Sequence, residues 1–269
     1  MGTAPRPGRQ LAALSHRAVL RAAAVAAGVA ARGGPADADA LTAMLYTAGS
    51  IPCGGRAGLD HDERRIDAVL TRGTAGLTGF RRHRGDYWQA WVTENDRAAG
   101  DPAISHVHKV YVSPLPDRLA AAVDAVARTA ADGGAHSFKV GGTASGIHRP
   151  DKIVLYFDTA ADADAAAHRL AVQLSGLPAH GVPFTGQVGE TGMVSRGFDQ
   201  SGLSWRLLVC RLLGSALARH AGRTEGGEEP GSADAAALTA RCLADAGAAG
   251  LDTRTFGPSA LAESAVLVP

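Results

Sequence analysis

Alternating hydrophobic and polar residues mark the centre of the chain as a sheet. Residues 107–113 (VHKVYVS) have the period of two that is typical of a half-buried strand. Two further strands are predicted at 136–141 (HSFKVG) and 151–158 (DKIVLYFD), with helices at 117–131 and 160–175. The resulting order β-α-β-β-α predicts an α+β fold, with helices packed on one face of a small antiparallel or mixed sheet.

The flanks of this core are rich in alanine and mostly helical in pattern. Helices are predicted over 11–31, 37–48, 62–72, 203–219 and 234–246, and a strand over 86–93. Other stretches favour loops or short strands: Arg81–Arg84 and 142–149 as loops, 193–199 as a short strand or turn, and 223–232 as an exposed loop. We therefore expect an N-terminal helical region (1–100) packing on an α+β core (101–210), followed by a C-terminal helical extension (211–269).

Composition restricts the possible partners. The 27 Lys and Arg residues balance 26 Asp and Glu residues to a net charge of +1, which argues against nucleic-acid or membrane-surface binding. Cys53, Cys210 and Cys242 form no CxxC pair, so neither a disulfide framework nor a thiolate zinc site is expected. Arg17 and Arg21 interrupt the apolar stretch 11–31, which favours an amphipathic helix over a signal peptide or anchor. We expect a cytoplasmic protein.

The common catalytic motifs are missing from the sequence. GGTASG at 141–146 follows a strand but lacks the Lys-Ser or Lys-Thr of a phosphate-binding P-loop. There is no GxSxG elbow and no HExxH pair. His106 and His108 lie two residues apart and could bind a metal on one strand face, but no third ligand has suitable spacing. We expect ordinary histidines, no metal and no cofactor.

Basic and aromatic residues on the three central strands offer a different chemistry. If those strands are neighbours, two lysines, two arginines and two tyrosines gather on one surface: Lys109, Lys139, Arg149, Arg196, Tyr111 and Tyr156. Such a cluster suits a phosphate or another dianion, which it would hold by charge-assisted hydrogen bonds. The alternative is that these side chains simply occupy the wet face of a one-sided sheet.

The order of these short segments resembles a known enzyme family. HKVYVS, a helix, FKV, a loop ending in arginine, KIVLYF and a later SRG are similar to the core of the phosphothreonine lyases of bacterial type III secretion, and to the lyase domains of lanthipeptide synthetases. The resemblance is strongest to effector-like lyases encoded beside a peptide kinase in actinobacterial lanthipeptide and thioamitide clusters. LTAMLY and AGLDTRTFGPS are similar to the flanks of that group. The motifs cover about one hundred residues, from Ser105 to Arg206.

The resemblance implies a role for each matching residue. Lys139 corresponds to the base that removes the α-proton, and Tyr111 stands where the family carries the histidine that protonates the leaving phosphate. The matches to the phosphate-binding residues are Lys109, Arg149, Tyr156 and Arg196, with Arg206 as a possible supplement. A phenol has a reference pKa of about 10, so it is protonated at neutral pH and can donate, although it is a weaker acid than imidazolium.

Other assignments remain open at the acid position. His106, at the edge of the strand, or His108, which faces the other way on an ideal strand, could supply the proton after local rearrangement. The tyrosine also permits a binding module that keeps the fold without turnover.

The activity implied by the resemblance is β-elimination of phosphate from phosphoserine or phosphothreonine, which gives dehydroalanine or dehydrobutyrine. The implied partners are a phosphorylated ribosomal precursor peptide and a peptide kinase. One alternative is a non-catalytic protein of the same fold that binds the precursor peptide or the kinase. Another is a type III effector-like protein that acts on a host phosphoprotein.

Overall fold

The computed structural model describes residues 10–52, 63–94, 106–200, 202–222 and 232–258. These residues belong to two compact units. The sheet unit contains Gly49–Val182 and Gln187–Gly202, and the helical unit contains Leu11–Ala48, Pro183–Gly186 and Leu203–Pro269. The division differs from the three consecutive segments expected, because the first and the last helices of the chain belong to one unit.

A mixed α+β fold with an antiparallel sheet confirms the predicted class. Among the described residues the sheet has seven strands in the order β1-β2-β4-β5-β3-β7-β6. The strands are β1 (Phe80–Arg84), β2 (Trp88–Thr93), β3 (His106–Val112), β4 (Ser137–Gly141), β5 (Ile153–Phe157), β6 (Gly186–Val188) and β7 (Val194–Gln200). The three strands predicted from the central pattern are neighbours, β4-β5-β3, and each neighbouring pair of strands from β1 to β7 is antiparallel.

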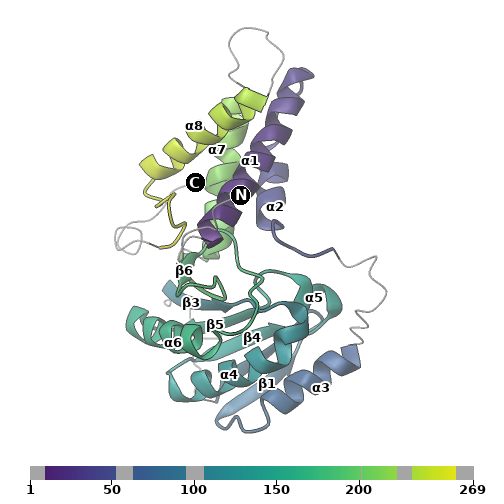
Figure 1. The fold of residues 1–269 in the computed structure, drawn as a ribbon, viewed down its shortest axis with the longest axis vertical. Coiled ribbons are helices and arrows are strands. Elements are labelled where there is room, and N and C mark those ends of the chain that lie inside the picture. Colours follow the sequence, from purple (N-terminus) through teal and green to yellow (C-terminus); the bar gives the residue numbers. More distant parts are fainter. Residues whose placement is uncertain (1–9, 53–62, 95–105, 201, 223–231, 259–269) are drawn as a thin grey trace. The chain divides into compact units, whose positions relative to one another are not determined.

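Helices cover one face of this sheet and build the main core against it. They are α3 (Glu63–Gly73), α4 (Leu119–Asp132), which a short 3-10 turn (Pro116–Arg118) precedes, and α6 (Ala160–Gln173); α4 and α6 lie on the same side of the strands (Figure 1). Alternate residues of β3, β4 and β5 point into this core, as the period of two predicts. Phe138 stacks on Trp91 with ring centroids 4.9 Å apart. The alanine side chains of α4 and α6 in this core are short, so the two helices can pack closely.

The helical unit is built from α1 (Gln10–Ala31), α2 (Ala38–Tyr46), α7 (Trp205–Ala221) and α8 (Ser232–Ala248). Helix α7 packs against both α2 and α8. At the α2–α7 contact a Cβ on Gly214 would collide with the Thr42 hydroxyl oxygen and lie 2.9 Å from the Ala38 carbonyl oxygen, so glycine permits this close packing. The inserted segment Pro183–Gly186 is held by the Phe184 amide, which donates to the Ser15 hydroxyl on α1 at 2.8 Å.

Two loop predictions are wrong. The run Arg81–Arg84 belongs to β1, because Arg82 lies over the Trp91 ring and pairs with Asp67 while the backbone pairs with β2. The stretch 142–149 contains the short helix α5 (Ala144–His148), whose start is capped by the Thr143 hydroxyl. The expected loop at 223–232 lies outside the described residues except for Ser232, which begins the last helix, and Cys53 also lies outside them.

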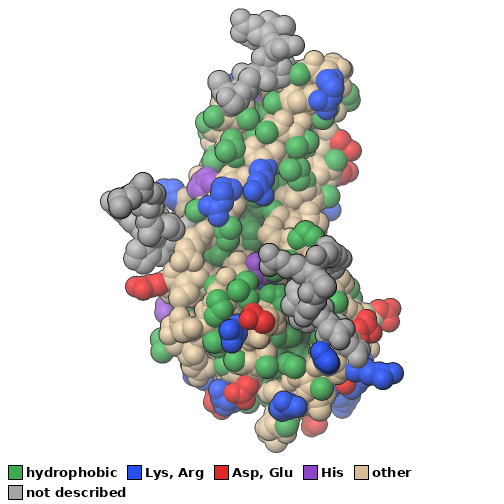
Figure 2. Space-filling model, turned by 45° about the vertical axis from the view of Figure 1, so that its right-hand side comes forward, with side chains coloured by type: hydrophobic (Ala, Val, Ile, Leu, Met, Phe, Trp, Pro, Cys, Tyr) green, Lys and Arg blue, Asp and Glu red, His purple; other side chains and the backbone are tan. Residues whose placement is uncertain are grey.

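The visible charges are mixed in sign. Figure 2 shows acidic and basic side chains beside each other at several places, as a net charge of +1 leads one to expect. Among the described helices, none is both long and apolar enough to cross a membrane.

Candidate active site

Two rows of side chains cross the face of the sheet that lies opposite α3, α4 and α6, here called the site face. The strand register places Lys139, Val154 and Tyr111 in one row. Ser137, Tyr156 and Lys109 form the next row. The sheet therefore brings together four of the residues that alternation predicted to share a surface: Lys109, Tyr111, Lys139 and Tyr156.

Lys139 has the chemistry of a base that works near neutral pH. Its ammonium nitrogen lies 4.6 Å from the centre of the Trp88 ring and 5.6 Å from that of Tyr156. Burial, followed by the positive charges of Lys109 and Arg149, lowers the pKa of Lys139 to about 8, against the opposing effect of two carboxylates, Asp151 and Asp199. A sizeable fraction of Lys139 is therefore neutral at mildly alkaline pH and able to accept a proton.

Lys109 supplies a second, nearly buried cation. Its Nζ forms an ion pair with Asp199 of β7 and lies 5.0 Å from the Tyr156 ring centre. The Tyr156 ring thus contacts both ammonium groups, and its electron-rich face stabilises them. This arrangement fixes the spacing between the two lysines.

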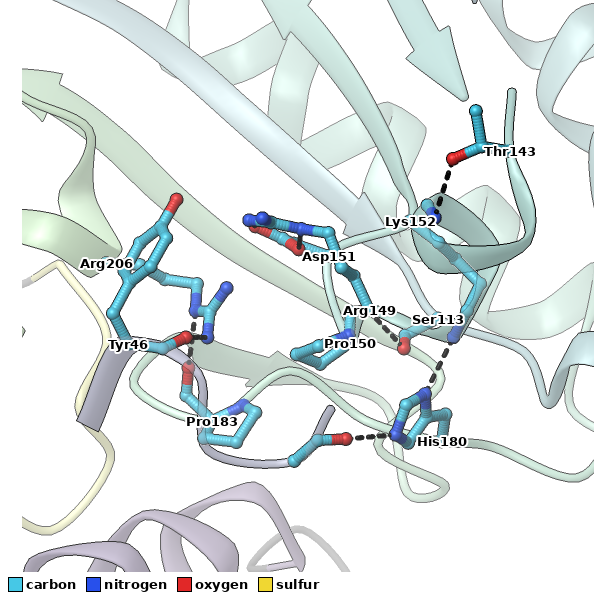
Figure 3. A network of polar contacts seen from close by, with 12 residues as sticks. Tyr46, Ser113, Thr143, Arg149, Pro150, Asp151, Lys152, His180, Pro183 and Arg206 are labelled. Atoms are coloured by element: carbon cyan, nitrogen blue, oxygen red, sulfur yellow. Dashed lines mark hydrogen bonds and ion pairs between the residues drawn. The ribbon is translucent and has the colours of Figure 1, made fainter. Parts of the chain in front are cut away.

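Arg149 approaches the same site from the end of α5. Its guanidinium binds Asp151 with two parallel contacts, Nε to Oδ1 and Nη2 to Oδ2, both 2.8 Å (Figure 3). The guanidinium carbon also lies 5.9 Å and 5.8 Å from the Tyr87 and Trp88 ring centres. A planar guanidinium held in this way is oriented for a bidentate oxyanion.

Tyr111 lies at the covered end of the row that begins at Lys139. It is 3% exposed and packs with Val154 and Val182 in a small hydrophobic cluster on the site face. The short Val154 side chain separates Tyr111 from Lys139 within the row.

Arg196 does not join this group. Its partner in the β3–β7 register is Val110, so it points to the helix-covered face, where its Nη1 pairs with Asp164 of α6. Ser195 and Gly197 face the site instead. The expectation that Arg196 shares a surface with the lysines is therefore wrong, because Arg196 stands one position away from the residues of β7 that face the site.

Two histidines, His106 and His108, were alternatives to Tyr111 as the acid. His108 faces the helix-covered side, as predicted, and its ring stacks on Phe198 with centroids 5.7 Å apart. The His106 backbone belongs to β3, but its side chain lies outside what the structure describes. His108 therefore lies across the sheet from Lys139.

Arg206 has its described contacts within the helical unit. Its Nε donates to the Pro183 carbonyl at 3.2 Å and its Nη2 to the Tyr46 carbonyl at 2.7 Å, and both bonds are drawn in Figure 3. The guanidinium also lies 4.8 Å from the Tyr46 ring centre. These contacts hold three segments of that unit together.

Sequence reasoning missed a buried network beside the site. Lys152 has no exposed surface; its Nζ donates to the Pro114 carbonyl at 2.8 Å and contacts His180 Nδ1 at 2.7 Å (Figure 3). His180 Nε2 lies 2.5 Å from the Gly49 carbonyl, which can only accept, so Nε2 carries the proton and Nδ1 accepts from Lys152. Burial lowers the pKa of Lys152 to about 7, although Asp151 opposes this.

Some of these missed residues had a usable signal. Alternation back from Tyr156 places Lys152 on the site face, and Asp151 stands two residues after Arg149. The pairing of Asp199 with Lys109 joins strands that are far apart in sequence, and no local pattern indicates it. In the described part of the chain, no group of three or more His, Cys, Asp or Glu residues could hold a metal ion.

Comparison with known proteins identifies the fold. No family model matches the chain, and neither does any curated protein. An effector protein from Pseudomonas syringae pv. tomato strain DC3000 has 16% identity and a TM-score of 0.54 over 89% of this chain and 98% of its own. An effector protein from Pseudomonas syringae pv. syringae strain 61 has 14% identity and a TM-score of 0.51 over 91% and 98%. This chain has the fold of these effectors.

Solved structures with a weaker likeness include phosphothreonine lyases. The type III effector and phosphothreonine lyase OspF from Shigella flexneri has 15% identity and a TM-score of 0.38, over 65% of this chain and 88% of its own. A likeness of that size assigns no activity to the chain, so a function has to be argued from the site itself.

Proposed function

We propose that this protein is a phosphoserine/phosphothreonine lyase that eliminates phosphate from a phosphorylated peptide. The observation that carries the proposal is Lys139, a lysine with a lowered pKa, beside Lys109 and Arg149 on one face of a sheet. A neutral amine next to two cations combines the two things that β-elimination needs. These are a base for the α-proton and positive charge for the departing phosphate.

The proposed elimination gives each proton and each electron pair a destination. Lys139 Nζ takes the proton from Cα, and the electrons of the C–H bond form the Cα=Cβ double bond. The Cβ–O bond breaks, and phosphate leaves with its electron pair. The products are dehydroalanine or dehydrobutyrine and phosphate, and the reaction involves no net oxidation or reduction.

Lys109 and Arg149 would bind the phosphate. Each is already oriented by a carboxylate, Asp199 and Asp151 respectively. A phosphate dianion competes with these carboxylates for the same N–H donors, so binding exchanges one anionic partner for another at cations that are already positioned. Tyr156 contacts both lysines and keeps their separation.

Tyr111 is the proposed acid. It lies in the same row as Lys139 with only Val154 between them, so the two side chains stand on the same face of the sheet, on the two strands that neighbour β5. The phenol would donate its proton to the leaving oxygen. Its position in a nearly buried cluster shields it from water.

The substrate that fits the sequence resemblance is a ribosomal precursor peptide of lanthipeptide-type biosynthesis, phosphorylated by a partner kinase. A second candidate is a protein that binds such a peptide without turnover. The specific observation that favours it is the tyrosine at position 111, where the resembled enzymes carry histidine.

Mass spectrometry of phosphothreonine and phosphoserine peptides incubated with the purified protein tests the proposal. Loss of phosphoric acid is expected with the wild type and not with Lys139→Ala or Lys139→Arg. The arginine variant keeps the charge near the phosphate but cannot act as a base at neutral pH, so it should still bind the peptide. Loss of only the phosphoryl group, which restores the hydroxyl, would contradict the lyase mechanism. Binding without any reaction would favour the second candidate.

A further inference from the structure

The site face continues past the lysines to the edge strand β1. The register extends the first row from Lys139 through Ala90 to His83. It extends the second row from Ser137 through Val92 to Arg81. His83 and Arg81 are both exposed, and they are on the same side of the sheet as the proposed catalytic groups.

Alternation divides the basic residues of β1 into two pairs with different surroundings. Arg82 and Arg84 point to the helix-covered side, where both bind the carboxylate of Asp67, at 2.6 Å and 3.1 Å. Arg81 and His83 point to the site face, and among the described residues neither has a carboxylate partner. The helix-side pair shares a carboxylate partner within the fold, while the site-face pair is available to a ligand.

The part of the site face between this pair and the lysines carries mostly short side chains. Ala90, Val92 and Ser137 are short and partly exposed, so among the described residues the second row leaves room for an extended peptide across β2 and β4. The Trp88 ring, which lies against Lys139, stands on the other side of Ala90 on the same face. From β1 to β5, where the phosphorylated residue would sit, there are three strand spacings, about 14 Å. An extended chain covers that distance in roughly four residues, and the reach of an arginine side chain shortens it by about one.

We propose that Arg81, assisted by His83, forms a second anion subsite that binds an acidic side chain of the substrate peptide about three or four residues from the phosphorylated residue. The position of the phosphorylated residue rests on the proposed function. Arg81 is charged at all physiological pH values and offers a fork of N–H donors to a carboxylate. His83 adds an N–H donor at the neighbouring position on the same face. The expected substrate class is therefore an acidic phosphopeptide.

Phosphothreonine peptides that differ only in charge test this subsite. Each carries Glu or Gln three and four residues from the phosphothreonine, on its N-terminal side in one set and on its C-terminal side in another. Because an exposed ion pair is weak, we expect one Glu peptide to have a kcat/KM about two- to fivefold above its Gln counterpart, which corresponds to about 0.4–1 kcal/mol. Arg81→Gln should bring this ratio close to one, and added salt should reduce it.

Arg84→Gln is the matched control, because it removes the same charge from the same strand but on the opposite face. It should leave the Glu preference unchanged. A wild type with no preference for Glu in either set would overturn the subsite, and so would an equal loss of preference in the two variants.

A binding measurement separates this proposal from the lyase activity. Fluorescence anisotropy of the same labelled peptides with Lys139→Ala needs no turnover. A Glu preference in binding that Arg81→Gln removes supports the subsite even if no elimination occurs. Binding that ignores the Glu residues, or no binding of any peptide, overturns it.

Discussion

The protonation of Lys139 depends on a small group of charges. Lys109, Lys139 and Arg149 contribute three positive charges, and Asp151 and Asp199 contribute two negative ones. The sum is 3 − 2 = +1, which falls to zero when Lys139 loses its proton. The site can therefore hold a neutral amine between two cations without a large excess of charge, which is what a base at this position requires.

The first residue-scale prediction is the pH dependence of elimination. Lys139 must be neutral to accept the α-proton, so kcat/KM should rise with pH through about 8 and level off above it. The rise in kcat should occur at a higher pH than the rise in kcat/KM, because a bound phosphate dianion stabilises the ammonium form of Lys139. Initial rates measured over a pH series check both profiles. The second ionisation of the substrate phosphate, at about pH 6, is well separated from the rise assigned to Lys139. A kcat/KM that is flat between pH 7 and 9 would contradict the role of Lys139.

A second prediction concerns Asp151. Its carboxylate raises the pKa of Lys139, so Asp151→Asn should lower that pKa and move the kcat/KM limb to lower pH. The variant also removes the carboxylate that occupies the Arg149 fork, so KM should fall. Asp158→Asn is the control, because Asp158 stands just beyond the other end of β5 and is not among the charges that act on Lys139. A limb that stays in place, or moves to higher pH, would contradict this coupling.

At the scale of elements, the position of Arg149 depends on a close contact between two glycines. An ideal Cβ on Gly146 would lie 2.9 Å from Gly141 Cα, so the backbone of α5 touches the end of β4. Arg149 is the residue that ends α5. The packing of this helix on the strand therefore sets where the guanidinium stands.

Gly146→Ala tests that dependence. The added methyl group meets backbone, which cannot move aside as a flexible side chain would, so α5 should shift. We expect a loss of about 1–3 kcal/mol in the free energy of unfolding, typical of overpacking, and a rise in KM that exceeds the fall in kcat. Denaturant unfolding and steady-state kinetics measure the two effects. Gly76→Ala is the control, because a Cβ there meets nothing within 4 Å. A Gly146 variant with wild-type KM would show that α5 does not position the phosphate-binding group.

The elements differ in how far the sequence predicts them. The strands β3, β4 and β5 were predicted within one or two residues, because strict alternation identifies a strand and assigns its faces. Strand β1 was missed because FRRHR has one apolar residue, and its pairing depends on Trp91 and Asp67 from other elements. The face of Arg196 was not predictable from MVSRGFD, where no clear alternation fixes which residues point inward.

At the scale of the whole molecule, periodicity indicates which helix face is buried but not what covers it. The terminal helices were predicted as separate flanks of the core. In the structure α1, α2, α7 and α8 share one unit, into which the short segment Pro183–Gly186 is also drawn. Contacts between residues that are distant in sequence determine this grouping, and a single sequence does not display them.

Arg206 shows how such distant contacts decide a residue's role. It is 1% exposed, and it binds the carbonyls of Pro183 and Tyr46, which lie on two other segments of the helical unit. Arg206→Met keeps much of the side-chain length but leaves these two carbonyls without their charged donor. We expect a loss of about 2–4 kcal/mol in the free energy of unfolding, measured by denaturant titration. Arg206→Lys should rescue little of it, because a single ammonium does not reproduce the planar fork that reaches both carbonyls.

The same variant separates this structural role from the phosphate-binding role that the family resemblance implies. If Arg206 acts through the helical unit alone, KM of the folded Arg206→Met protein should stay within about twofold of the wild-type value, a difference of about 0.4 kcal/mol. Kinetics are compared at a temperature where both proteins are fully folded. A KM that rises about tenfold or more while stability is unchanged would restore Arg206 to the phosphate site. Arg196→Met is the parallel measurement on the sheet unit: its ion pair with Asp164 lies on the helix-covered face, so this variant too should lose stability and keep its KM.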